Sequence, residues 1–371
     1  MKRYHRECIE RVKPYVPGKP IEEVQRELEL NEVVKLASNE HPIGPSPKAL
    51  RAIRENLGTI NRYPDSSCYY LKKALAKHLS VKEENLLIGN GSDETITLAV
   101  KAFVNEGDEV VIATPTFLIY EIAAQVANAM IRLVPMRDLR YDLKAMAAAA
   151  GKAAKMVFIA NPDNPTGTYV RRAELEEFLD AVGPHTIVFL DEAYFEFAKD
   201  LGDYPDGLAY LGRPNLIVAR TFSKAYGLAG LRVGYAASTP ELIGYLDRVR
   251  EPFNVNMLAQ VAARAALDDR KFLKATLAHV KKEKAYLAAS LGAMGLECVE
   301  SATNFILVNV RVDCRALFER LLREGVIVRD MQVWGFDTYI RVTAGTRAEN
   351  RKFLGALEKA LRAIRAPKEK P

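Results

Sequence analysis

Short runs of β-branched and apolar residues recur between residues 86 and 238, and this alternation limits the possible fold more than any other feature. Each run is followed by a polar or Pro/Gly-marked turn, and helical stretches separate several of them. The pattern predicts a mostly parallel sheet covered by helices on both faces, an α/β architecture with ligands at the carboxyl ends of its strands. The expected strands are residues 86–88, 109–113, 156–160, 187–190 and 216–219.

The chain has 371 residues, which fits one large and one smaller domain. A long helix is expected over residues 268–291, and a smaller α+β domain after it. Its expected strands are residues 305–310 and 339–342, and its expected helices are residues 315–324 and 347–364. We therefore expect an N-terminal arm (1–40) joining the small domain, a large domain (41–270) and a small C-terminal domain (271–371) with a fraying basic tail (366–371).

Composition excludes several classes of protein. Apolar residues make up 49% of the chain and charged residues 27%, as in an ordinary globular protein. No apolar run approaches the roughly 20 residues of a membrane span, and the polar start has no signal core, so we expect a cytoplasmic protein with no membrane partner. The net charge of +6 is spread along the chain, so no nucleic-acid partner is expected, although it could also help to attract anionic substrates.

The metal-ligating residue types show no ligand spacing. The four cysteines form no CxxC pair, and the histidines are scattered. We expect reduced thiols and no bound metal. The cysteines are Cys8, Cys68, Cys298 and Cys314.

An expected strand runs into a glycine turn at Ile88-Gly89-Asn90-Gly91-Ser92-Asp93-Glu94, followed by a helix start capped at Ser92 or Asp93. Free amides at such a start can hold a phosphate. An ordinary strand-to-helix turn fits this segment equally well. A dinucleotide-binding dehydrogenase is disfavoured because the third glycine of its fingerprint is missing.

Two polar segments follow the next expected strands. Asn161-Pro162-Asp163-Asn164-Pro165-Thr166-Gly167 places amide groups at the mouth of the sheet, where prolines stiffen the turn. Asp191-Glu192-Ala193-Tyr194 places an acid at the end of a buried strand. A buried carboxylate needs a cation or several donors, so Asp191 calls for a partner such as a protonated ring nitrogen; capping of a following helix is the alternative.

The last segment, Thr221 to Gly234, places Lys224 after a strand, among hydroxyls and glycines and before Arg232. A lone lysine is usually a solvated surface residue. A desolvated lysine beside another cation has a lowered pKa and becomes a nucleophilic amine suited to Schiff-base chemistry. Thr221, Ser223 and Arg232 would supply donors for a phosphate.

These four segments, in this order, resemble the fold-type I aminotransferases, whose cofactor is pyridoxal phosphate. The resemblance implies a large domain with a seven-stranded, mostly parallel sheet between helices. It also implies that Lys224 holds the cofactor as a Schiff base and shuttles the substrate's α-proton, and that Asp191 pairs with the pyridine nitrogen. Asn164 and Tyr194 would hydrogen-bond the ring hydroxyl.

The same resemblance assigns the remaining cofactor contacts. Phe117 would stack on the ring, where many relatives carry tyrosine, and ordinary core packing is the alternative for it. Tyr63, in Asn61-Arg62-Tyr63-Pro64-Asp65, is similar to a tyrosine that reaches the cofactor from a partner subunit, so a homodimer is expected. The phosphate would be bound by the amides of Ser92, Asp93 and Glu94 and by the side chains of Thr221, Ser223 and Arg232.

Four flanking segments resemble the histidinol-phosphate aminotransferases: residues 13–19, 36–47, 250–256 and 340–346. That family converts L-histidinol phosphate and 2-oxoglutarate into imidazole-acetol phosphate and L-glutamate in histidine biosynthesis. The resemblance implies that Arg329 and Arg341 bind the anionic substrates and that Tyr15 and Asn39 line the same site. His41 stands where many relatives carry asparagine, and its role stays open.

Three other functions remain possible at this stage. An aromatic amino-acid aminotransferase would use the same arginines for a carboxylate, and a phosphothreonine-type decarboxylase shares the scaffold. A pyridoxal-phosphate-binding regulatory module is disfavoured, since no separate winged-helix segment or basic cluster precedes the phosphate turn.

Overall fold

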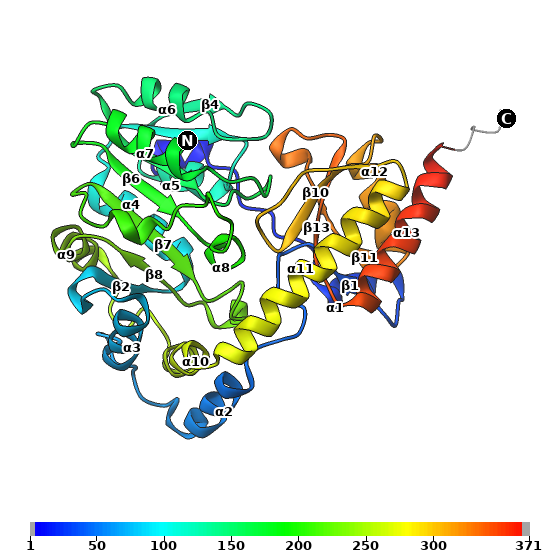
Figure 1. The fold of residues 1–371 in the computed structure, drawn as a ribbon, viewed down its shortest axis with the longest axis horizontal. Coiled ribbons are helices and arrows are strands. Elements are labelled where there is room, and N and C mark those ends of the chain that lie inside the picture. Colours follow the sequence, from blue (N-terminus) through cyan, green and yellow to red (C-terminus); the bar gives the residue numbers. More distant parts are fainter. Residues whose placement is uncertain (1–3, 366–371) are drawn as a thin grey trace.

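The computed structural model describes residues 4–365, so the expected basic tail lies outside the described residues. Figure 1 shows a large sheet with its helices on the left and a smaller C-terminal layer on the right. The long helix α11 (Arg270–Ala293) runs from beneath the large sheet into the smaller layer. The expected helix is therefore confirmed, and it begins after Asp269, whose side chain accepts a hydrogen bond from the Phe272 amide.

The large sheet has seven strands in the order β2-β8-β7-β6-β5-β3-β4. All neighbouring pairs are parallel except those of β8, which runs antiparallel to both β2 and β7. This confirms the expected seven-stranded, mostly parallel sheet. The strands are β2 (Leu86–Gly89), β3 (Glu109–Thr114), β4 (Met130–Pro135), β5 (Ala154–Ala160), β6 (Ile187–Asp191), β7 (Leu216–Thr221) and β8 (Gly234–Ala237).

Helices cover both faces of this sheet because successive side chains of a strand point to opposite faces. Val110 packs in one core with α4, α5 and α9, whereas its neighbour Val111 packs in another with α6 and α7. A third core joins α2, α3 and α10 to β2 and β8. These helices are α2 (Pro47–Asn56), α3 (Tyr69–Leu79), α4 (Gly91–Phe103), α5 (Leu118–Val126), α6 (Leu143–Ala150), α7 (Arg172–Ala181), α8 (Phe195–Ala198), α9 (Pro240–Val249) and α10 (Met257–Leu267).

The C-terminal layer has its own core and its own sheets. An antiparallel sheet has the order β12 (Arg329–Asp330), β13 (Tyr339–Thr343), β10 (Phe305–Asn309) and β9 (Glu297–Cys298). The N-terminal segment joins this layer, because β1 (Val34–Lys35) pairs in parallel with β11 (Val326–Ile327). The helices here are α1 (Ile21–Leu28), α12 (Cys314–Arg323) and α13 (Arg347–Arg365). Val24, Leu36 and Ala37 pack in this same core, so we propose an arm (1–40) joining the small domain (271–371), beside a large domain (41–270).

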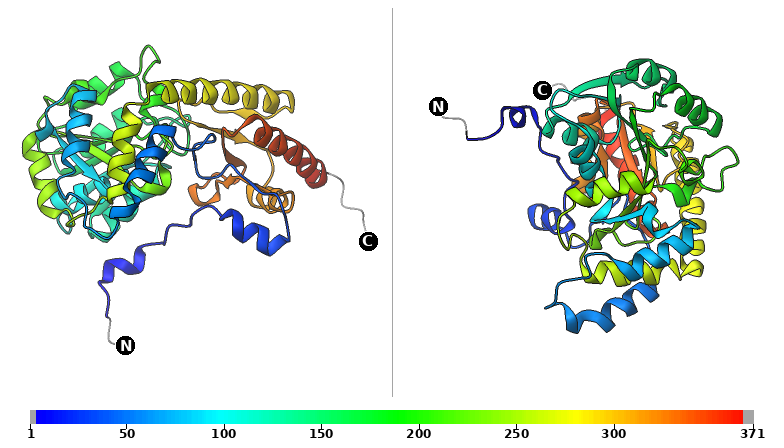
Figure 2. Two further views of the ribbon diagram at one scale, coloured as in Figure 1. Left: turned by 90° about the horizontal axis from the view of Figure 1, so that it is seen from below. Right: turned by 90° about the vertical axis from the view of Figure 1, so that its left-hand side faces the viewer.

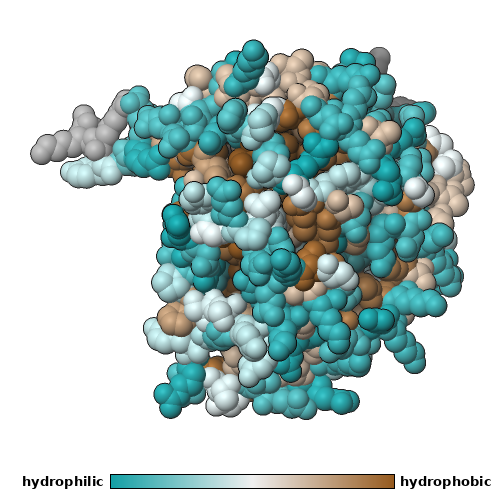
Figure 3. Space-filling model, turned by 60° about the vertical axis from the view of Figure 1, so that its left-hand side comes forward, coloured by the Kyte–Doolittle hydropathy of each residue, from teal (hydrophilic) through white to brown (hydrophobic). Residues whose placement is uncertain are grey.

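Short 3₁₀ helices complete the chain: η1 (Glu7–Arg11), η2 (Leu57–Thr59), η3 (Glu83–Asn85), η4 (Gly207–Tyr210), η5 (Ala229–Leu231) and η6 (Gln332–Trp334). Figure 2 shows η1 near the outer end of the N-terminal arm, where it contacts α5 of the large domain. The face in Figure 3 is mainly hydrophilic, with hydrophobic side chains gathered in hollows near its middle. No helix within residues 4–365 is long and apolar enough to cross a membrane.

The start of α4 differs from the sequence-based expectation. The helix begins at Gly91, and its N-cap is Asn90, so Ser92 and Asp93 lie inside the first turn. The Asn90 side chain makes no cap hydrogen bond; instead the Glu94 carboxylate accepts a bond of 2.6 Å from the Asn90 amide. The expectation of a cap at Ser92 or Asp93 was wrong by two or three residues, because the N-cap lies at Asn90.

Candidate active site

A cavity of about 350 Å³ lies where β5, β6 and β7 end. Its volume is within the roughly 300–1,000 Å³ of small-molecule sites, and its position is where ligands bind in open α/β sheets. The predicted site residues that line it are Tyr15, Asn39, Ser92, Asp93, Phe117, Asn164, Asp191, Tyr194, Thr221, Ser223, Lys224, Arg232, Arg329 and Arg341.

Lys224 follows β7 and lies within the cavity wall. Its Nζ donates to the Ser38 carbonyl oxygen at 3.4 Å. Burial, and then the positive charge of Arg341, lower the pKa of Lys224 to about 8. At neutral pH a useful fraction of this amine is therefore unprotonated, as a nucleophile requires.

Asp191 ends β6 and is 5% exposed. Its Oδ2 accepts from the Tyr120 hydroxyl at 2.8 Å, and its Oδ1 accepts from the Ala193 amide at 3.0 Å. Burial raises the pKa of Asp191 to about 6, and the Tyr120 hydrogen bond opposes that rise. Both of these donors to the Asp191 carboxylate are neutral groups, so a protonated ring nitrogen would fit the need of this carboxylate.

The first turn of α4 and Arg232 lie together at one end of the cavity, where the Arg232 guanidinium donates to the Asp93 carboxylate at 3.0 Å. Two glycines bring these groups together: a Cβ on Gly91 would lie 2.5 Å from the Arg232 guanidinium, and a Cβ on Gly234 would lie 2.8 Å from the Ser92 amide. Gly91 also has a φ of +79°, which favours glycine. Free amides at a helix start together with a guanidinium suit a phosphate monoester.

Side chains of both layers meet at the other end of the cavity. The Asn39 amide donates to the Tyr194 hydroxyl at 2.8 Å. Burial raises the pKa of Tyr194, and Arg341 opposes that rise. Arg341 itself donates to Asn164 Oδ1 and, at 2.8 Å, to the Ala37 carbonyl.

Arg329 and Arg341 both keep unused donors. Arg329 donates to the Val16 carbonyl at 2.9 Å. The Nε atoms of both arginines are buried without a partner in the described part of the chain. Two desolvated cations with free donors fit an anionic group of a substrate.

Two predicted residues lie apart from this cavity. The Glu94 carboxylate is taken by Asn90 and by Asn254, and its amide does not line the cavity. Tyr63 is 83% exposed and stacks on Phe253, with ring centroids 4.7 Å apart. Their expected roles therefore stay predictions: the Glu94 amide as a donor to the phosphate, and Tyr63 as a contact to the site of a partner subunit.

Sequence reasoning missed three contributors. Tyr120 donates to Asp191, and the Ser38 carbonyl accepts from Lys224. The Trp334 ring contacts the two arginines. Tyr120 lies three residues after Phe117, so the helical spacing could have placed both on one face of α5. The other two contacts join segments that are distant in the sequence, and no local pattern signals them.

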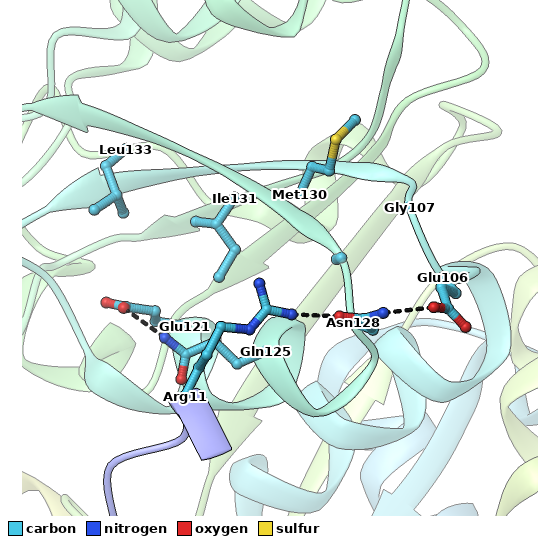
Figure 4. A pocket seen from close by; sticks show the side chains of 10 residues that line it. Arg11, Glu106, Gly107, Glu121, Gln125, Asn128, Met130, Ile131 and Leu133 are labelled. Carbon is cyan, nitrogen blue, oxygen red and sulfur yellow. Dashed lines mark hydrogen bonds between the residues drawn. The ribbon is translucent and has the colours of Figure 1, made fainter. Parts of the chain in front are cut away.

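A second hollow, of about 590 Å³, lies between η1 and the edge strand β4. Figure 4 shows its side chains, where Asn128 accepts from Arg11 and donates to Glu106. It contains none of the predicted site residues. The described residues hold no group of three or more His, Cys, Asp or Glu side chains placed to bind a metal.

The fold and the cavity define an aminotransferase of fold type I. In agreement, the family profile "Aminotransferase class I and II" matches residues 31–357. The histidinol-phosphate aminotransferase of Moorella thermoacetica is 52% identical over 358 residues, covering 96% of this chain and 92% of that protein. Histidinol-phosphate aminotransferase 2 of Carboxydothermus hydrogenoformans is 44% identical, with 97% and 99% covered.

A solved structure agrees with these relatives. The histidinol-phosphate aminotransferase of Sinorhizobium meliloti, in complex with pyridoxal-5'-phosphate, superposes with a TM-score of 0.91 at 32% identity, covering 98% of this chain and 99% of that one. The chain belongs to the histidinol-phosphate aminotransferase family.

Proposed function

We propose that this protein transfers the amino group of L-histidinol phosphate to 2-oxoglutarate, giving imidazole-acetol phosphate and L-glutamate in histidine biosynthesis, with pyridoxal 5'-phosphate as cofactor. The observation that carries the proposal is one cavity that unites a low-pKa lysine, a buried carboxylate, a phosphate cradle and two arginines with unused donors. The names of the relatives support the choice of substrate.

The residues present fit the cofactor. Lys224 would hold its aldehyde carbon, Asp191 its ring nitrogen, Asn164 and Tyr194 its ring hydroxyl, and Phe117 one ring face. Its phosphate would be bound by the first turn of α4 and by Thr221, Ser223 and Arg232. When bound, pyridoxal phosphate supplies an electron sink for the bond that breaks at the substrate's α-carbon.

Asp191 and Lys224 would act on two different protons, one on the ring nitrogen of the cofactor and one on the α-carbon of the substrate. Asp191, whose carboxylate accepts from the Tyr120 hydroxyl and the Ala193 amide, would keep the ring nitrogen of a bound cofactor protonated. The Lys224 amine, with its pKa lowered to about 8, would accept the proton from the substrate's α-carbon and would return it to the C4′ carbon of the cofactor.

Arg329 and Arg341 bind the anionic ends of both substrates. The phosphate of the amino donor and a carboxylate of 2-oxoglutarate offer oxygens to the same guanidinium groups. Tyr15 and Asn39 line this end of the cavity and close it from the N-terminal side.

We also propose a cytoplasmic homodimer in which Tyr63 contacts the site of the partner subunit. Its support is the 83% exposure of Tyr63, outside the cavity of its own chain, together with its stacking on Phe253. Sedimentation of the holoenzyme tests this: a dimer is expected, and a fully active monomer would remove the role of Tyr63.

Two variants and two amino donors test the reaction. Lys224→Ala should lose turnover by at least about a thousandfold while still binding cofactor, since it removes the nucleophile. Lys284→Ala is the matched control, because burial also lowers the pKa of Lys284 to about 8 although it lies outside the cavity. Its turnover should stay near that of the unaltered protein, and equal losses in both variants would contradict the role of Lys224.

The amino donors are L-histidinol phosphate and L-phenylalanine, each with 2-oxoglutarate, and glutamate is measured. Turnover mainly with histidinol phosphate is the expected result. A preference for phenylalanine would make the protein an aromatic amino-acid aminotransferase, and carbon dioxide release from phosphothreonine without glutamate would make it a decarboxylase.

A further inference from the structure

Trp334 connects the small C-terminal layer to the large sheet. It is the single tryptophan of the chain, lies in η6 between β12 and β13, and is 8% exposed. Its indole Nε1–H donates to the Thr116 carbonyl at 2.8 Å, across 218 positions of the sequence. The indole N–H is therefore satisfied across the two layers and not within its own.

The acceptor side of this bond is fixed. Thr116 lies in the turn between β3 and α5, immediately before Phe117 of the cavity wall. The Thr116 hydroxyl donates to the buried carboxylate of Asp163 at 2.7 Å and is 2.6 Å from the Tyr141 hydroxyl. Trp334 is thus held against a rigid part of the large domain.

The face of the same indole meets both arginines of the cavity. The guanidinium carbon is 5.2 Å from the ring centroid for Arg329 and 5.8 Å for Arg341. The two arginines are direct cross-strand partners in the β12–β13 ladder, an arrangement in which like charges repel. A cation within about 6 Å of an indole face is attracted by the ring, so Trp334 offsets part of that repulsion.

The kind of partner matters for binding. A carboxylate beside Arg329 and Arg341 would neutralise them and occupy their N–H groups. An aromatic face stabilises the charges and leaves the donors unused, in keeping with the Nε atoms of both residues, which have no partner within residues 4–365.

We propose that Trp334 is a positioning residue for substrate binding: it holds Arg329 and Arg341 together, charged and unneutralised, at a fixed place relative to Phe117. This rests on the proposed function, because it assumes that the two arginines bind the anionic group of the substrate. Trp334 does not line the cavity, so it acts through the arginines.

Two substitutions separate the two contacts. Trp334→Phe removes the N–H donor and keeps an aromatic face, and it should raise KM for the amino donor about 3- to 10-fold, the range for one lost hydrogen bond. Trp334→Leu removes both contacts and should raise KM about 30-fold or more. For both variants kcat should stay within about twofold and cofactor retention should not change.

Phe336→Leu is the matched control. Phe336 packs in the same apolar cluster as Trp334, and no contact of its ring with either arginine is recorded among the described residues. Its KM should stay within about twofold. A rise of KM in this control equal to that of Trp334→Leu would show that packing alone matters, and would overturn the proposal.

A binding measurement keeps the test independent of folding and of the reaction. Glutarate, a five-carbon dicarboxylate without an oxo or amino group, can bind the arginines of the holoenzyme but cannot react. Because Trp334 is the only tryptophan, its fluorescence in the unaltered protein should change in a saturable way with glutarate. Glutarate that inhibits competitively without changing this fluorescence would contradict the proposal.

The proposed function can fail separately. If the unaltered holoenzyme does not use histidinol phosphate, the choice of substrate is wrong, and the donor that it does use serves for the KM comparison. If the unaltered enzyme turns over normally and Trp334→Phe and Trp334→Leu, folded and with cofactor, keep its KM, the inference about Trp334 is wrong.

Discussion

Replacing Tyr120 by phenylalanine should shift the pH dependence of the reaction. The Tyr120 hydroxyl is one of two donors to the Asp191 carboxylate, at 2.8 Å, and it is fully buried. A hydrogen bond to a charged group contributes roughly 1.5–3 kcal/mol, and 1.36 kcal/mol corresponds to about one pH unit in a proton equilibrium. Tyr120→Phe should therefore weaken the ionised form of Asp191 relative to its protonated form.

The sign follows from the direction of the shift. Burial raises the pKa of Asp191 to about 6, and the Tyr120 bond lowers it, so the variant has a higher pKa. Asp191 must be ionised to keep the ring nitrogen protonated. When the pH is lowered, the variant should therefore lose activity at a higher pH than the unaltered protein does. The acid limb of kcat/KM against pH should move upward by roughly one unit or more, with about a tenfold loss near pH 6 and a smaller loss near pH 8.5.

The assay is kcat/KM for glutamate formation from pH 5.5 to 9, with the absorbance of the bound cofactor recorded at each pH. Tyr141→Phe is the control, because Tyr141 is a partly buried phenol whose hydroxyl contacts Thr116 and Asp163 but not Asp191. An unmoved acid limb in Tyr120→Phe, or the same movement in Tyr141→Phe, would refute the reasoning.

Three further predictions concern stability, substrate binding and metals. Arg220→Met leaves the fully buried Glu192 without its partner, which should cost about 3–5 kcal/mol and lower Tm by roughly 6 to 20 °C. Burial raises the pKa of Glu192 and Arg220 opposes this, so the variant raises it further. A carboxyl whose pKa is raised in the folded state stabilises the fold below its unfolded pKa, and this stabilisation is lost as the pH rises. The Tm deficit of the variant should therefore be larger at pH 8 than at pH 5. A deficit that does not depend on pH would argue against the charge explanation. Arg341→Lys should raise KM for 2-oxoglutarate about tenfold in steady-state assays, since lysine lacks the bidentate fork, and an unchanged KM would place the carboxylate elsewhere. Dialysis against EDTA should leave activity unchanged, whereas removal of pyridoxal phosphate should abolish it until the cofactor is added back.

The elements that could be predicted are those that a local sequence pattern indicates. The five apolar runs correspond to β2, β3, β5, β6 and β7, because buried parallel strands are continuously apolar. The edge strand β4 was missed since its side chains are largely exposed. β8 was missed since three of its four residues are glycine or alanine, which are not typical of strands. The helical patterns near residues 315 and 347 gave α12 and α13 to within one residue.

The site was predictable where a reactive residue lies at or shortly after the carboxyl end of a strand. Asp191 is the last residue of β6 and Lys224 lies three residues after β7, so strand pattern and residue type sufficed to bring them together. Tyr120 and Trp334 could not be foreseen, since their contacts depend on how a helix face and a distant 3₁₀ turn pack in three dimensions.

One half-reaction tests the central claim most directly. Holoenzyme is mixed with L-histidinol phosphate in the absence of 2-oxoglutarate, and the yellow cofactor absorbance and the imidazole-acetol phosphate formed are measured. The account predicts loss of the yellow absorbance with one equivalent of product per site, and glutamate only after 2-oxoglutarate is added. Retention of the yellow absorbance, with no product, would contradict it.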